Sequence, residues 1–208
     1  MKLLILGATG PTGQQLVKQS LEKHHQVIAL VRDPAKLNIH HDNLSIIKGD
    51  VLDKSILTMA LESNDAVLSA LGVGKTLRSS NLMQGAMKNL IAAMKEMNIK
   101  RIIFLSAFGV GETFAQADFI QKIIFRTLLK NIYTDKAKAD SMLQQSLLDF
   151  TIVSPVVLTN GPYTGKYKAA EILPMKGLPN ISRADVADFM LQQLTDITYL
   201  KKTVVLKS

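Results

Sequence analysis

Short apolar runs alternate along the chain with amphipathic stretches. The apolar runs, which we interpret as strands, are 3–6, 26–31, 43–48, 65–69, 101–106, 149–154 and 203–206. Apolar residues recur at helical spacing in the stretches between them, 14–23, 55–61, 77–97, 119–130, 134–145 and 184–194. Strands that alternate with helices favour a parallel sheet covered by helices on both faces. The pattern therefore predicts an α/β fold, a doubly wound parallel sheet with its ligand at the carboxyl ends of the strands.

The stretch 119–130 carries apolar and basic residues on opposite sides of the helix that it predicts. The apolar side holds Phe119, Ile120, Ile123, Ile124 and Leu128, and the basic side holds Lys122, Arg126 and Lys130. We interpret this stretch as a core helix with a solvated, charged face. The alternative is a helix that lies on a membrane surface or on a partner.

The turn after the first strand contains three glycines at three-residue spacing, Gly7, Gly10 and Gly13. A strand, a glycine-rich turn and a helix in this order are typical of a Rossmann-type dinucleotide-binding unit. Gly7 permits the tight turn, Gly10 lets backbone N–H groups approach a pyrophosphate, and Gly13 lets the helix lie close to the strand. The alternative is a glycine turn without a ligand.

Residues within the same turn support the cofactor interpretation. Pro11 suits a first helical position, where no backbone N–H is needed. The free N–H groups of the first helical turn form an anion site, and Thr9 and Thr12 add hydroxyl donors. We therefore expect Gly7, Thr9, Gly10, Pro11, Thr12 and Gly13 to bind the cofactor.

Length and composition predict a single domain over residues 1–208. The chain has 208 residues, of which 47% are hydrophobic, so it can bury a sizeable core. Two segments that follow strands, 109–120 and 157–180, are predicted to be small loops that line a substrate site. The chain has no Cys and no apolar run of the roughly eighteen residues that a membrane span needs. We expect no membrane span and a cytoplasmic location.

The net charge of +8 raises the question of a nucleic-acid partner. The basic residues are scattered, and only 5% of the residues are aromatic, without basic–aromatic interleaving. We therefore expect no nucleic-acid binding. The histidines, which we interpret as surface residues with no metal site, are His24, His25, His40 and His41.

Several motifs follow one another in the order found in a known family. They are Gly-Ala-Thr-Gly-x-Thr-Gly at 7–13, Val-Arg-Asp-Pro at 31–34, Gly-Asp-Val at 49–51, Ser-Ala-Leu-Gly at 69–72, Ser-Ala-Phe-Gly at 106–109, Thr-Ile-Val-Ser-Pro at 151–155 and Ile-Ser-Arg-Ala-Asp-Val-Ala at 181–187. Through them the chain resembles atypical short-chain dehydrogenases/reductases, nearest to small NAD(P)H-binding proteins similar to biliverdin-IXβ/flavin reductase and to NmrA-like proteins. The resemblance implies further cofactor contacts at Asp50, Val51, Leu71, Gly72, Ser106, Pro155 and Val156.

Arg32 indicates which dinucleotide is preferred. NAD-preferring folds place an acid at the end of the second strand to accept a hydrogen bond from the ribose 2′-hydroxyl. Arg32 occupies that place here, and a guanidinium can pair with a 2′-phosphate. We predict NADPH in preference to NADH, although Asp33 supplies an acid next to it. The alternative is a solvent-facing Arg at a strand end.

The catalytic Tyr-x-x-x-Lys pair of short-chain dehydrogenases is missing. Lys136 lies four residues before Asp140, which matches the family's spacing, but Ile132 stands at the Tyr position. Tyr133 is predicted to cap a helix junction. The candidate catalytic residues are therefore Ser106, at the end of a strand, and Lys136. For Ser106 the alternative is hydrogen bonding to a strand-end backbone group.

A cofactor site without an evident proton donor suits hydride transfer to a flavin or quinone, because such acceptors can take their proton from water. We predict an NADPH-dependent reductase of a flavin, quinone or similar planar acceptor. Val157 stands where biliverdin/flavin reductases carry a His, which argues against bilin reduction. The alternatives are an NmrA-like NADP(H)-binding redox sensor without turnover and a non-redox epimerase or isomerase. The sequence also leaves open whether the protein forms a homo-oligomer.

Overall fold

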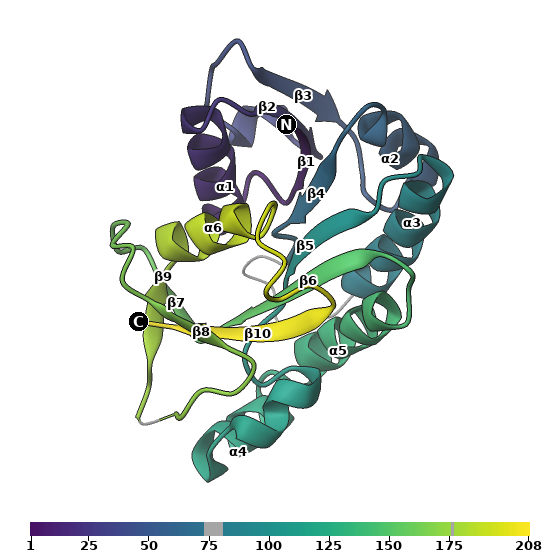
Figure 1. The fold of residues 1–208 in the computed structure, drawn as a ribbon. Coiled ribbons are helices and arrows are strands. Elements are labelled where there is room, and N and C mark those ends of the chain that lie inside the picture. Colours follow the sequence, from purple (N-terminus) through teal and green to yellow (C-terminus); the bar gives the residue numbers. More distant parts are fainter. Residues whose placement is uncertain (73–80, 176) are drawn as a thin grey trace.

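An eight-stranded sheet forms the centre of the molecule in this computed structural model, which describes residues 1–72, 81–175 and 177–208 (Figure 1). In spatial order its strands are β3 (Leu44–Lys48), β2 (Gln26–Val31), β1 (Lys2–Leu6), β4 (Ala66–Ser69), β5 (Arg101–Leu105), β6 (Asp149–Pro155), β10 (Lys202–Lys207) and β8 (Lys168–Ala170). All neighbouring strands run parallel except β8, which pairs antiparallel with β10. The strand order reverses at β1, so the crevice between β1 and β4 is where such folds bind a ligand.

Helices cover both faces of the sheet. The helices α1 (Pro11–Glu22) and α6 (Arg183–Gln192) lie on one face, and α2 (Lys54–Leu61), α3 (Leu82–Glu96) and α5 (Lys130–Gln144) lie on the other (Figure 1). In β1 the buried side chains alternate: Leu3 and Ile5 join one core, and Leu4 and Leu6 join the other. A strand buried on both sides reads as a continuous apolar run, which explains the run at 3–6.

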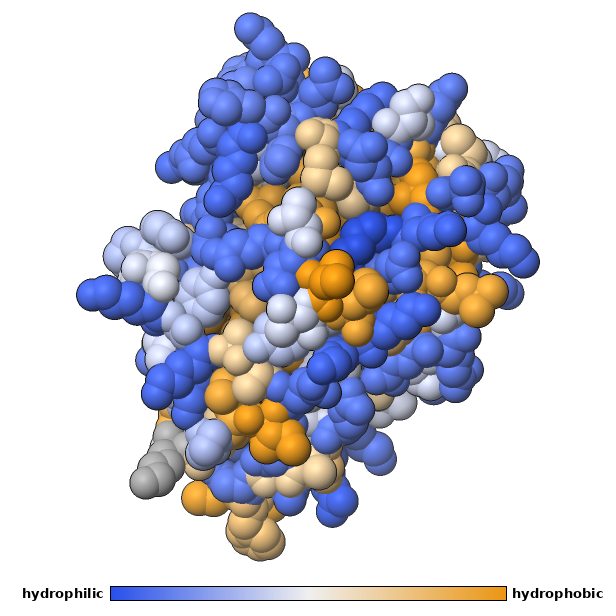
Figure 2. All heavy atoms as spheres, in the orientation of Figure 1, coloured by the Kyte–Doolittle hydropathy of each residue, from blue (hydrophilic) through white to orange (hydrophobic). Residues whose placement is uncertain are grey.

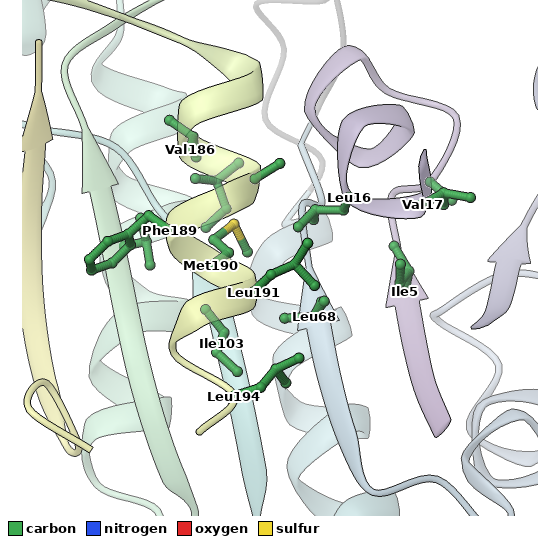
Figure 3. Packing of buried hydrophobic residues seen from close by; sticks show 14 of the residues in the cluster. Ile5, Leu16, Val17, Leu68, Ile103, Val186, Phe189, Met190, Leu191 and Leu194 are labelled. Atoms are coloured by element: carbon green, nitrogen blue, oxygen red, sulfur yellow. The ribbon is translucent and has the colours of Figure 1, made fainter. Parts of the chain in front are cut away.

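The core under α1 and α6 is built from apolar side chains of helices and strands that are far apart in sequence. Figure 3 shows Leu16 of α1 beside Leu191 of α6, and Val17, on the other side of α1, above Ile5 of β1; Met190 belongs to the same cluster. All of these side chains are 4% exposed or less. This packing holds the start of α1 against the carboxyl end of β1, where the glycine turn lies.

The sequence predictions of strands and helices are largely confirmed. Every predicted strand and helix has a counterpart, and most ends differ by one or two residues. The predicted helix 77–97 is α3, while its predicted start at 77–80 lies outside the described residues. No helix in the described part of the chain is long and apolar enough to cross a membrane.

The segment predicted as a loop over 157–180 contains more order than expected. It holds β7 (Val157–Thr159) and β8, and β9 (Asn180–Ser182) follows it, pairing with β7 in a small parallel ribbon. Three-residue strands are too short to show a hydrophobic period, so the sequence pattern does not reveal them. The other predicted loop, 109–120, contains a short 3₁₀ helix at Gly111–Gln116.

The prediction that the helix at 119–130 belongs to the core is wrong. The helix α4 (Phe119–Thr127) is present, but its apolar side is turned outward. The exposed side chains are Phe119, Ile120, Ile123, Ile124 and, just after the helix, Leu128. The helix packs on the protein through its other side, which includes the buried Gln121.

Candidate cofactor and reaction site

The glycine turn has the geometry that dinucleotide binding requires. Gly7 has φ of +76°, a conformation that L side chains rarely adopt. A Cβ on Gly7 would lie 2.5 Å from the carbonyl oxygen of Ala70, and one on Gly13 would overlap the carbonyl group of Gly7. Glycine is therefore required at both positions by close backbone approach, between β1 and β4 and between β1 and α1.

Gly10 is less crowded than the other two glycines, since a Cβ there would meet only the Gly7 carbonyl oxygen, at 3.3 Å. It is the N-cap residue of α1, with φ of −77°, and Pro11 occupies the first helical position. Among the described residues no side chain caps this helix end, which leaves its first N–H groups available to an anion. The neighbouring Thr12 is 6% exposed. The turn thus fits the phosphates of a dinucleotide.

Arg32 and Asp50 lie at the ends of neighbouring strands. The amide of Gly49 donates to the carbonyl of Val31 at 2.9 Å, which brings the two strand ends together. Arg32 is exposed and makes no hydrogen bond or ion pair with any of the described residues. The Asp33 carboxylate is engaged by other residues: it accepts a hydrogen bond from the Ala35 amide at 3.3 Å and forms an ion pair with Lys36 Nζ at 3.2 Å. The acid beside Arg32 is therefore engaged locally.

The other predicted cofactor residues also gather at the carboxyl edge of the sheet. Leu71 and the exposed Gly72 follow β4 directly beside Gly7. Val51 is 7% exposed, and its side chain joins the core beneath β3. At the end of β6, the Pro155 carbonyl accepts from the Phe108 amide, and the Val156 amide donates to Leu206. The Pro155 carbonyl and the Val156 amide are thus engaged within the protein, and the cofactor role of both residues stays a prediction.

Ser106, Asp140 and Lys136 are brought together where β5 ends against α5. Ser106 Oγ donates to Asp140 Oδ2 at 2.7 Å, and both residues are buried. Lys136 Nζ donates to the Leu105 carbonyl at 3.3 Å, beside Ser106. The two candidate catalytic residues therefore lie in one cluster, together with an acid that the sequence analysis noted only for its spacing.

Asp140 is held in an unfavourable environment for a charge. Its Oδ1 atom is buried and has no hydrogen-bond partner among the described residues. Burial raises the pKa of Asp140 to about 6, although the hydrogen bond from Ser106 and the Lys136 charge act in the opposite direction. Burial likewise lowers the pKa of Lys136, against the influence of Asp140 and Asp135. The Asp140 carboxyl can therefore gain or lose a proton near pH 6.

Tyr133 does not take the place of the missing catalytic tyrosine. Its hydroxyl donates to the Phe108 carbonyl at 3.2 Å, and its ring lies 4.9 Å from that of Phe125. Burial raises the pKa of Tyr133 to about 12, so the phenol stays neutral. It joins α4 and α5, as predicted for a residue at a helix junction. Val157, which the resemblance predicts to stand in place of the family's His, is exposed.

Asp135 is a second acid whose role the sequence analysis missed. It is 2% exposed, and its carboxylate accepts from the amides of Met83 and Gln84 at 3.1 Å each. It therefore caps the start of α3 from another helix. A cap supplied from 51 or 52 residues away leaves no local signal in the sequence.

With this geometry described, comparison with known proteins settles the family. A model described as NAD(P)H-binding matches residues 7–197. The chain belongs to this NAD(P)H-binding family. The prediction of a small NAD(P)H-binding member of the atypical short-chain dehydrogenases/reductases is thereby confirmed.

Among curated relatives, the chain is 31% identical over 205 residues to the uncharacterized sugar epimerase YhfK of Bacillus subtilis. The matched stretch covers 94% of this chain and 89% of YhfK. It is 36% identical over 119 residues to phenylcoumaran benzylic ether reductase TP7 of Nicotiana tabacum, covering 52% of this chain. The chain spans only 36% of TP7 and 35% of the Photosystem II assembly factor Ycf39 of Synechocystis.

Solved structures show the same fold over the whole chain. The oxidoreductase ylbE from Lactococcus lactis has a TM-score of 0.83 at 24% identity, covering all of this chain and 91% of that one. The anaerobilin reductase ChuY from Escherichia coli O157:H7 has a TM-score of 0.81 at 22% identity, with 97% of ChuY covered. At these identities the likeness shows the fold alone.

Proposed function

We propose that the protein is an NADPH-dependent reductase that passes hydride to a flavin, a quinone or a similar planar acceptor. A bound nicotinamide would supply the hydride. The single observation that supports this choice best is the Ser106–Asp140 pair beside Lys136, which lies at the carboxyl end of β5, on the edge of the sheet where ligands bind in such folds. Together with the neutral Tyr133, it favours an acceptor that needs little help from a phenolic acid.

The residues of the chain would divide the work between binding and orientation. The glycine turn and the uncapped start of α1 would hold the pyrophosphate, and Arg32 would pair with a 2′-phosphate. Ser106 would orient the nicotinamide or the acceptor through its hydroxyl, and Asp140 would position that hydroxyl. Because the pKa of Asp140 is raised to about 6, its carboxyl group can also hold or release a proton beside Ser106 Oγ.

Oxidation of NADPH in the presence of flavin mononucleotide or menadione tests the proposal. We expect steady loss of NADPH absorbance with at least one of the two acceptors, and much less with NADH. Tight NADPH binding without turnover over a broad set of acceptors would instead favour an NADP(H)-binding redox sensor.

A second candidate is an epimerase, since the relative YhfK is named a sugar epimerase. Such an enzyme would keep its cofactor and consume none in net terms. Interconversion of nucleotide sugars without loss of NADPH absorbance would support this alternative over the reductase.

A further inference from the structure

The helix α4 is amphipathic, but its apolar side faces outward, whereas the apolar side of a core helix faces the protein interior. Its exposed apolar side chains range from 37% exposure at Ile124 to 78% at Phe119, and Leu128 after the helix is 70% exposed. At 100° per residue, these positions and Ile120 and Ile123 share one broad face. Hydrophobic side chains lie at the lower end of the molecule in Figure 2, where Figure 1 places α4.

The opposite side of α4 anchors it to the protein. Gln121 is 7% exposed and completes a capping box with Asp118 at the start of the helix. The Phe125 ring contacts the rings of Phe108 and Tyr133, with centroids 6.4 and 4.9 Å apart. The helix is therefore held with its apolar face outward. Large exposed apolar patches of this kind mark interaction sites.

Basic residues border this apolar face. Arg126 and Lys122 lie over the Phe114 ring, at 5.0 and 5.9 Å from its centroid, and Lys130 is exposed at the start of α5. None of the three forms an ion pair within 4.0 Å with the residues that the structure describes. In sequence, the acid nearest to Lys122 is Asp118, which caps α4, and the acid nearest to Lys130 is Asp135, which is buried. The border of the patch is thus positively charged.

We propose that α4 docks on an anionic lipid surface, with Phe119, Ile120, Ile123, Ile124 and Leu128 entering the headgroup region. The arrangement of an apolar face with a basic border on a helix at the edge of the molecule is that of an interfacial helix. Lys122, Arg126 and Lys130 would then attract acidic headgroups, in keeping with the net charge of +8. A second copy fits less well, because pairing two such faces would bring these cations together.

Co-sedimentation with lipid vesicles tests the proposal on the full chain. We expect binding to vesicles of phosphatidylcholine mixed with phosphatidylserine, and little binding to phosphatidylcholine alone. Ile120→Ser combined with Ile123→Ser should weaken binding at least tenfold, since it removes two inserted side chains. Arg126→Gln should weaken it about fivefold, as expected for one cation near an anionic surface.

Two exposed apolar residues outside α4 provide matched controls. Leu147 is 92% exposed and Ile197 is 73% exposed, so Leu147→Ser with Ile197→Ser removes similar apolar area elsewhere. Circular dichroism of every variant checks that the fold is retained. Absence of binding to acidic vesicles, or an equal loss in the control variant, would overturn the proposal. So would a dimer in light scattering that Ile120→Ser with Ile123→Ser dissociates, because the face would then belong to a second copy.

Discussion

At the scale of single residues, the burial of Asp140 affects both the stability of the protein and the protonation of its candidate site. An isolated carboxylate costs free energy when it is buried, and only Ser106 donates a hydrogen bond to it in the described structure. The folded-state pKa of about 6 lies above the ordinary value of 3.8, so the native state binds the proton more tightly than the unfolded chain. Asp140 therefore favours folding at acid pH and loses that contribution as the pH rises through 6.

The variant Asp140→Asn should remove this pH dependence. The difference of about two units between the folded-state and unfolded-state pKa of Asp140 corresponds to about 3 kcal/mol. The unfolding free energy of the variant, minus that of the native protein, should therefore rise by up to ~3 kcal/mol between pH 4 and pH 8. Urea unfolding at several pH values measures it. Any cost of the buried amide is independent of pH and cancels in this comparison. Parallel stability curves for the two proteins would show that Asp140 does not titrate in this range.

Arg32 offers a prediction about cofactor choice. It is exposed and unpaired among the described residues, while Asp33 is bound to Ala35 and Lys36. Charge-assisted hydrogen bonds are worth about 1.5–3 kcal/mol each, so Arg32→Ala should weaken NADPH binding ~10- to 100-fold and leave NADH binding nearly unchanged. Calorimetry with both cofactors measures this, and Lys18→Ala is the control for loss of a surface cation. An equal loss for NADH would assign Arg32 to the adenine or to the fold.

At the scale of elements, the turn between β1 and α1 separates structural glycines from a binding glycine. Gly7 and Gly13 approach backbone atoms too closely for any side chain. Gly10 has an ordinary φ, and a Cβ there would meet only the Gly7 carbonyl oxygen, at 3.3 Å. We therefore expect the motif to serve two purposes, folding at its ends and phosphate approach at its centre.

The variants Gly10→Val and Gly13→Ala should fail in different ways. Gly10→Val should retain the fold and lose dinucleotide binding, because its branched side chain would occupy the space above the helix start. Gly13→Ala should lower the unfolding free energy by several kcal/mol, since its Cβ would overlap the Gly7 carbonyl group. Thermal unfolding and cofactor titration of both variants measure the contrast. Unaltered cofactor binding by Gly10→Val would contradict the site assignment.

At the scale of the whole molecule, Asp185 ties the segment after β6 to the central domain. Its carboxylate accepts from the amides of Thr164 and Gly165, at 2.8 and 2.9 Å, and from the hydroxyls of Thr164 and Ser182. Burial alone would raise its pKa, but these hydrogen bonds outweigh burial and lower it. The charged carboxylate at the start of α6 thus holds a segment that the sequence predicts to line the substrate site.

This arrangement predicts a loss of stability in acid. Because the folded-state pKa of Asp185 is depressed, its contribution is complete above the unfolded value of about 4 and is lost as the pH falls below it. At pH 7, Asp185→Asn should lower the unfolding free energy by ~2–3 kcal/mol, and the difference should shrink in acid. Denaturant unfolding measures it, with the exposed Asp42→Asn as control. A difference that is the same at pH 3 and pH 7 would rule out this linkage.

The sequence alone determined the parts of this protein that depend on local patterns. Buried strands such as 3–6 read as apolar runs because both of their faces are covered, and the parallel sheet follows from their alternation with helices. The glycine spacing at 7–13 determined the turn, because only glycine fits the backbone contacts there. The family resemblance rests on these same local motifs.

Tertiary structure decided what depends on residues that are distant in sequence. The apolar pattern of α4 predicted burial, but a helical period does not say which side meets the protein, and contacts through Phe125 and Gln121 turned it outward. Asp140 meets Ser106 only because α5 packs against the end of β5, 34 residues away in the chain. Spacing along a chain specifies a face of a helix, whereas the charge, burial and partner of a side chain are properties of the surface against which that face packs.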